Sequence, residues 1–76
     1  MTEGETERLL EVRINGGIRR VRGPLTLADL LRELGLPGGR GVAVERNSRI
    51  VKRGDWAATR IEDGDRLEIV TLVGGG

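Results

Sequence analysis

The chain has 76 residues, with 13 basic and 12 acidic side chains and a formal net charge of +1. This length has room for one domain with one small core, and the balanced charge provides no general attraction to nucleic acid or anionic lipid. The sequence contains no His, Cys or Tyr. Because the usual general bases, zinc ligands and nucleophiles are missing, we expect neither a catalytic centre nor a metal site.

The cysteine-free composition also excludes disulfides and agrees with a reducing compartment. Residues 1–8 are polar and lack the basic start and apolar run of a secretory signal. No apolar stretch approaches the length needed to cross a membrane. We therefore expect a cytoplasmic protein without membrane association, in which residues 1–8 form a disordered polar extension.

A hairpin is predicted at the start of the domain. Apolar and charged residues alternate from Leu10 to Ile14, which indicates a strand with one face on a core. Asn15-Gly16 accepts the positive φ values of a tight turn, so residues 18–22 should return as a second strand. Three arginines interrupt the alternation there, which is typical of an edge strand and leaves a basic docking patch as the alternative.

A capped helix follows. Thr26 and Asp29 form a Thr-x-x-acid capping box, and Gly35 is placed to end the helix. Between them, one apolar stripe has helical spacing: Leu27, Leu30, Leu31 and Leu34.

The middle of the chain predicts short strands and connections. Residues 36–41 are glycine-rich but precede a strand, which is the wrong order for a phosphate-binding loop. Strands are expected at residues 41–46 and 50–51. Trp56, the only aromatic residue, is expected to close one end of the core rather than to stack on a ligand.

The last strand is predicted at residues 66–73, after a turn at Asp63-Gly64-Asp65 that lacks the remaining ligands of a calcium loop. Its Leu67 and Ile69 should face the helix. Val70 and Leu72 then lie on the opposite face, where with Val73 they form either a protein-docking surface or a partly covered apolar patch.

Three glycines follow: Gly74, Gly75 and Gly76. Without side chains, such a segment is flexible, extended and thin enough to thread a narrow channel. We expect the Gly76 carboxylate to be a substrate of partner enzymes that supply all the catalysis. The alternative is a frayed terminus or a linker.

The order of elements resembles the ubiquitin-like β-grasp fold, an α+β fold with a mixed four- to five-stranded sheet packed on one main helix. Several segments, taken together in their order and spacing, are more specific than the fold: Val42-Ala43-Val44-Glu45-Arg46-Asn47, Ile50-Val51, Lys52-Arg53, Trp56, Asp63-Gly64-Asp65, Leu67-Glu68-Ile69-Val70 and Val73-Gly74-Gly75-Gly76. Through them the chain, from Leu9 to Gly76, resembles the ThiS family of thiamine-biosynthesis sulfur carriers. The domain would span residues 9–73 and the tail residues 74–76.

The resemblance implies a role for each part of the tail. An E1-like, ThiF-type enzyme would use ATP and Mg²⁺ to adenylate Gly76, with Gly74 and Gly75 threading its active site. Sulfur from a donor such as a cysteine desulfurase would convert Gly76 to a thiocarboxylate, and thiazole synthase (ThiG) would accept the sulfur. The chain itself would bind no cofactor and would be a monomer when free.

Other carriers with the same fold remain as alternatives. The molybdopterin-synthase small subunit typically has prolines before its terminal glycines, and residues 71–73 contain none. A tRNA-thiolation carrier or a ubiquitin-like modifier would use the same terminus, although a single lysine, Lys52, argues against lysine-linked chains. An RNA-binding β-grasp module is disfavoured because only Trp56 could stack on bases and the charge is balanced.

Overall fold

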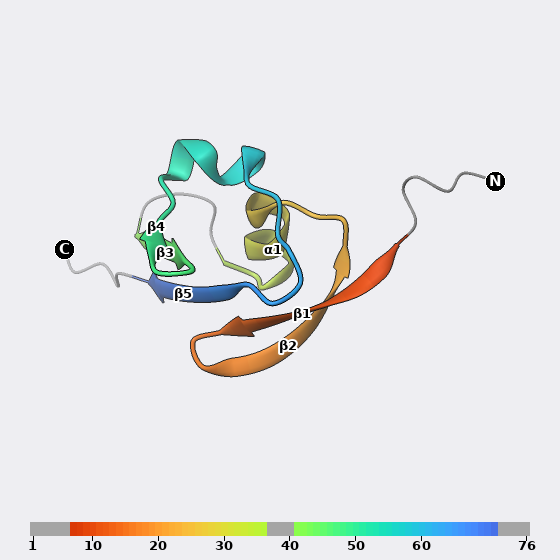
Figure 1. The fold of residues 1–76 in the computed structure, drawn as a ribbon. Helices are drawn as coiled ribbons and strands as arrows, with labels where there is room; N and C mark the ends of the chain where they lie inside the picture. The colour runs from red at the N-terminus through yellow and green to blue at the C-terminus, as the bar shows by residue number, and fades with distance from the viewer. Residues whose placement is uncertain (1–6, 37–40, 72–76) are drawn as a thin grey trace.

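The computed structural model describes residues 7–36 and 41–71. Within them the chain forms a five-stranded mixed sheet, one α-helix and one 3-10 helix (Figure 1). The strands are β1 (Arg8–Ile14), β2 (Gly17–Gly23), β3 (Val42–Arg46), β4 (Arg49–Ile50) and β5 (Arg66–Thr71), and the helices are α1 (Leu27–Glu33) and η1 (Arg53–Ala58). The order across the sheet is β2-β1-β5-β3-β4, so the last strand of the chain is the central one.

The predicted hairpin is confirmed. β1 and β2 pair antiparallel through a two-residue turn, with Asn15 at φ 49° and Gly16 at φ 87°. Asn and Gly tolerate these left-handed values better than other residues. β2 is an edge strand, as its arginines indicated. β1 begins at Arg8, one residue before the expected domain boundary.

The helix is capped as the sequence predicts. Thr26 Oγ1 accepts a hydrogen bond from the Asp29 backbone N–H at 3.1 Å, and Asp29 Oδ2 accepts one from the Thr26 N–H at 3.0 Å. The bond from the Thr26 backbone is the main reason that the pKa of Asp29 lies below its ordinary value. Gly35, at φ 78°, lies just beyond the C-terminal end.

One face of the sheet is covered, because α1 and η1 lie on the same side of it (Figure 1). The core forms between them from Leu10, Val12, Val21, Leu25, Leu27, Leu30, Leu31, Val44, Trp56, Ile61, Leu67 and Ile69. Trp56 is buried at one side of this core, as expected, and its indole Nε1–H donates to the Val51 carbonyl at 2.9 Å. No helix in the described ranges is long and apolar enough to cross a membrane.

A buried carboxylate holds the start of β5. Asp65 is only 5% exposed and accepts hydrogen bonds from Arg46 Nε at 2.8 Å, Asn47 Nδ2 at 3.0 Å and the Glu62 N–H at 2.8 Å. Burial by itself raises the pKa of Asp65, but these hydrogen bonds and the charge of Arg46 outweigh burial and lower the pKa below its ordinary value. The Asp63–Asp65 segment is therefore a structural turn, as predicted.

Replacing this carboxylate tests its contribution to stability. We expect Asp65→Asn to lower the free energy of unfolding at pH 7 by about 2–4 kcal/mol, because Arg46 loses its buried partner. Since the folded-state pKa is lowered, the stabilisation is present above the unfolded pKa and lost as pH falls through the folded pKa. Urea unfolding from pH 7 to pH 2 should show the two proteins converging in acid. A pH-independent difference would contradict this account.

Candidate functional site

β5 is held differently along its two edges. On one side it pairs antiparallel with β3 as far as Thr71, which is opposite Val42. On the other side its parallel pairing with β1 covers only Arg66 and Leu67. The second half of β5 therefore extends past the end of β1, toward residues 72–76.

The side chain of Asn15 continues the pairing where β1 ends. Its Oδ1 accepts a hydrogen bond from the Ile69 N–H at 2.7 Å, and its Nδ2 donates to the Ile69 carbonyl at 3.0 Å. These are the two bonds that a neighbouring strand would make with this residue. The hairpin turn thus holds the last described part of β5 from the side.

The two faces of β5 differ as the sequence predicts. Leu67 and Ile69 are buried under the helices, whereas Val70 is 52% exposed on the opposite face. The remaining residues predicted to form the site, Leu72, Val73, Gly74, Gly75 and Gly76, lie outside the described residues.

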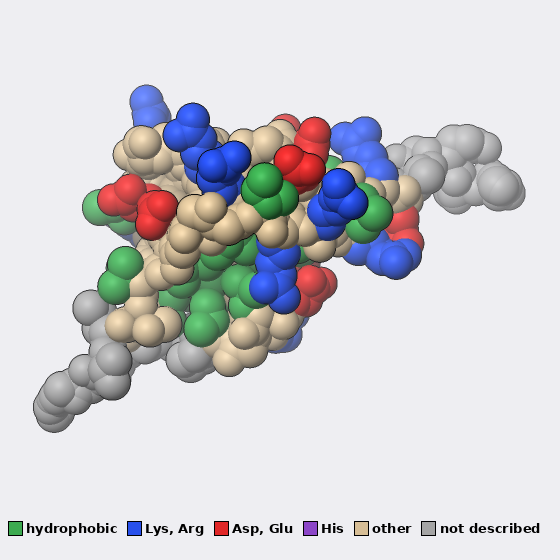
Figure 2. All heavy atoms as spheres, turned by 90° about the horizontal axis from the view of Figure 1, so that it is seen from below, with side chains coloured by type: hydrophobic (Ala, Val, Ile, Leu, Met, Phe, Trp, Pro, Cys, Tyr) green, Lys and Arg blue, Asp and Glu red, His purple; other side chains and the backbone are tan. Residues whose placement is uncertain are grey.

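The uncovered face of the sheet carries the four large apolar side chains that are exposed in the described part of the chain: Leu9, Ile18, Ile50 and Val70. The strand register assigns them to this face, because Leu9 and Val70 alternate with buried neighbours. Ile18 and Ile50 are opposite the outward-facing Arg13 and Glu45. Figure 2 views the molecule from below and shows hydrophobic side chains at the surface among basic and acidic ones.

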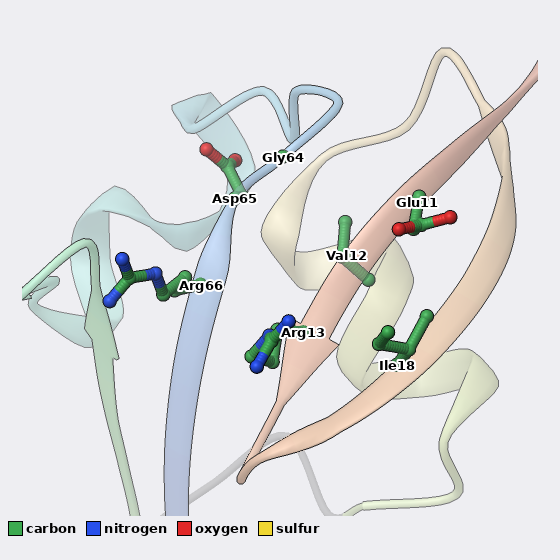
Figure 3. Close-up of a pocket in the computed structure, with 7 residues that line it drawn as sticks. All are labelled: Glu11, Val12, Arg13, Ile18, Gly64, Asp65 and Arg66. Carbon is green, nitrogen blue, oxygen red and sulfur yellow. The ribbon is translucent and has the colours of Figure 1, made fainter.

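A shallow hollow of about 370 Å³ lies on this face where β1 meets the start of β5 (Figure 3). Arg13 and Arg66 line it from neighbouring strands, and Glu11 and Ile18 complete its rim. Two backbone N–H groups at the hollow are already used, since Arg13 donates to Asp65 and Gly64 donates to Glu11. The hollow therefore offers charge but no cradle of free backbone donors at these positions.

Within the described ranges no cluster of His, Cys, Asp and Glu is arranged to hold a metal ion. The side chains of the uncovered face are apolar or permanently charged at neutral pH, and none is a nucleophile of the usual kind. This face thus offers apolar and charged groups for contact with another molecule.

A family model described as the ThiS family matches residues 12–76. The chain belongs to the ThiS family. The crystal structure of the thiamine biosynthesis protein ThiS from Geobacter metallireducens superposes with a TM-score of 0.74 at 32% identity, covering 88% of this chain and 100% of that one. The ubiquitin-like β-grasp fold and the ThiS resemblance predicted from the sequence are both confirmed.

Two further ThiS-like matches are segments of longer proteins. The chain is 48% identical over 63 residues to a thiazole synthase of Paramagnetospirillum magneticum, covering 83% of this chain and 19% of that protein. It is 36% identical over 67 residues to a thiazole synthase of Magnetococcus marinus, covering 88% of this chain and 20% of that protein. The chain thus spans about a fifth of the length of these relatives.

Sequence reasoning missed two features of this site. The Asn15-Gly16 pair signalled a turn, but nothing local indicated that the Asn15 side chain binds a residue 54 positions away. The outward position of Ile50 was also not predicted, because the sequence indicated only a short apolar strand at residues 50–51 and not which side chain faces outward. The β3–β4 register places Ile50 opposite the outward-facing Glu45, and this register puts the Ile50 side chain on the uncovered face.

Two Asn15 variants test the side-chain clamp on β5. Asn15→Gly keeps the turn geometry but removes both hydrogen bonds, and should cost about 1–2 kcal/mol of stability. Asn15→Asp keeps the acceptor for the Ile69 N–H and loses the donor. Amide hydrogen exchange at Ile69 should therefore be slowest in the wild type, faster in Asn15→Asp and fastest in Asn15→Gly. Equal exchange in all three proteins would show that Asn15 does not hold the strand.

Proposed function

We propose that this chain is a sulfur carrier for the synthesis of the thiazole of thiamine, and that its Gly76 carboxylate carries the sulfur. The observation that supports this most directly is the ThiS family match, which runs from β1 through the glycine tail to Gly76. The similarity in fold to a thiamine biosynthesis protein ThiS supports it independently.

The proposed chemistry takes place on partner enzymes. A carboxylate is a poor electrophile, so the Gly76 carboxylate first attacks the α-phosphorus of Mg²⁺-bound ATP, forming an acyl adenylate and releasing pyrophosphate. A sulfide equivalent then attacks the acyl carbon and AMP leaves, which produces the thiocarboxylate. A ThiF-type adenylyltransferase would catalyse the first step. With a donor such as a cysteine desulfurase, the sulfur arrives as a persulfide, and a thiol must then reduce the resulting acyl disulfide to release the thiocarboxylate.

The chain's own contribution is presentation of the tail. β5 is anchored on three sides, by the buried Leu67 and Ile69, by β3 and by Asn15. Gly74, Gly75 and Gly76 add no side chains, so a narrow channel can admit them. A rigid strand followed by a thin segment would deliver a carboxylate into a partner's active site while the domain stays outside.

Thiazole synthase is the proposed acceptor of the sulfur. Two relatives named thiazole synthase contain a segment similar to this chain, and that segment makes up about a fifth of each protein. A carrier-like segment within the same chain as a synthase is consistent with direct transfer between the two. This supports thiazole as the destination over the molybdopterin and tRNA alternatives.

The proposed docking surface for these partners comprises Val70 of β5 together with Leu72 and Val73, which follow β5 in the sequence. Val70 contributes an exposed apolar side chain directly before the tail. Docking there would place the partner's active site within reach of Gly76.

The decisive test is mass spectrometry of the protein after incubation with ATP, Mg²⁺, a sulfide source and the ThiF-type enzyme. Replacement of one oxygen by sulfur, located at Gly76 by fragmentation of the C-terminal peptide, is the expected result. Fragmentation also separates this change from oxidation of Met1 or Trp56. An unmodified terminus with an enzyme that is active on a known carrier would refute the proposal.

Substitutions in the tail should block activation without unfolding the domain. Gly75→Val and Gly76→Val add side chains that a narrow channel excludes, so we expect ATP–pyrophosphate exchange to fall at least 100-fold. The melting temperature should stay within about 1 °C, because the core side chains described above, from Leu10 to Ile69, are unchanged. Exchange at the wild-type rate would show that the tail does not thread a confined site.

A charge at Val70 should affect docking more than folding. Val70→Arg places a cation on the exposed face, and we expect the dissociation constant for the ThiF-type enzyme to rise at least tenfold. The change in unfolding free energy should be under about 0.5 kcal/mol, since the site is exposed. A matched loss of stability and binding would instead identify Val70 as part of the core.

A further inference from the structure

Two pairs of like-charged residues are register partners on the uncovered face of the sheet. Glu45 of β3 is the register partner of Glu68 of β5, and Arg13 of β1 is the partner of Arg66 of β5. All four side chains are exposed, and none joins an ion pair within residues 7–36 and 41–71. Like charges directly opposite on neighbouring strands destabilise a sheet. These pairs therefore lower the stability of the sheet in the free protein.

The acidic pair lies among apolar side chains. Val70 follows Glu68 on the same face of β5, and Ala43 is opposite Val70 on β3. Ile50, which is 75% exposed, is opposite Glu45 on the other side. We name these five residues, Ala43, Glu45, Ile50, Glu68 and Val70, the acidic–apolar patch.

The two like-charge pairs lie toward different ends of the face. The basic pair, Arg13 and Arg66, lies at the hollow where β5 begins. The acidic–apolar patch lies where β5 ends, next to the segment that leads to the tail. A binding partner therefore meets apolar groups and negative charge at the end from which the tail departs.

We infer that the acidic–apolar patch docks the enzyme that activates Gly76, and that this enzyme presents an apolar contact bordered by Arg or Lys side chains. The inference rests on the proposed function and adds the chemistry of the partner's surface. A cation placed between Glu45 and Glu68 would remove their mutual repulsion. Relief of this repulsion would therefore contribute favourable free energy to docking. Val70 and Ile50 would supply the apolar contact.

The position of the patch fits the reach of the tail. Gly76 lies five positions beyond Thr71, and an extended chain of that length spans at most about 18 Å. An enzyme seated on Val70 can therefore hold its active site within that distance of the patch. The basic end of the face lies at the opposite end of β5, farther from the tail.

A charge reversal with a matched control tests the inference. Glu45→Lys turns the repulsive pair into an attractive one, whereas Glu33→Lys makes the same change in net charge on α1, on the other side of the sheet. Binding of each variant to the ThiF-type enzyme is measured by calorimetry at two salt concentrations, and melting temperature by circular dichroism.

We expect Glu45→Lys to weaken binding at least tenfold, to reduce its salt dependence and to raise the melting temperature by about 1–5 °C. Glu33→Lys should bind within about twofold of the wild type. Glu68→Gln, which removes one charge without reversing it, should weaken binding about threefold. A rise in stability together with a loss of binding separates a docking role from a structural one.

Three results would overturn the inference. The inference requires Glu45→Lys to bind the ThiF-type enzyme more weakly than Glu33→Lys does, so equal affinities of the two variants contradict it. Weakened binding to thiazole synthase alone would assign the patch to that enzyme, and loss of self-association in sedimentation would assign it to a second copy of the chain. If the variants bind normally while the wild type forms a Gly76 thiocarboxylate, the proposed function stands and only the docking inference fails.

Discussion

The leucines of α1 pack against one face of the sheet, and the rest of the described structure depends on this one-sided burial. Each buried leucine contributes about 1.5–3 kcal/mol, which a domain of this size needs in order to fold. With only one main helix, the sheet has one covered face and one exposed face. Inward and outward residues alternate along β1, β3 and β5, and the outward ones are available for recognition.

The central strand connects this core to the proposed chemistry. β5 is both the last strand of the chain and the middle strand of the sheet, so the segment entering the tail starts from the best-supported part of the domain. Two polar side chains add to the support that backbone pairing provides. Asp65 holds the start of β5 through Arg46 and Asn47, and Asn15 holds its second half at Ile69.

The exposed face shows a conflict between stability and recognition. A sheet optimised only for stability would place opposite charges at Glu45 and Glu68, because cross-strand pairs on an exposed face contribute up to about 1 kcal/mol. A carrier, by contrast, must bind an enzyme and then leave it. A modest electrostatic gain on docking, added to a small apolar contact, provides recognition that is specific and still reversible.

Local sequence patterns alone determined the hairpin at Asn15-Gly16, the capped helix from Thr26 and the outward position of Val70. Each depends on neighbouring residues, through turn geometry, capping or the two-residue period of a strand. Only the tertiary structure decided that Asn15 binds Ile69, that Asp65 binds Arg46, and that Glu45 is opposite Glu68. These contacts join strands that are distant in the chain, and the register that brings them together is set by packing the whole sheet under α1.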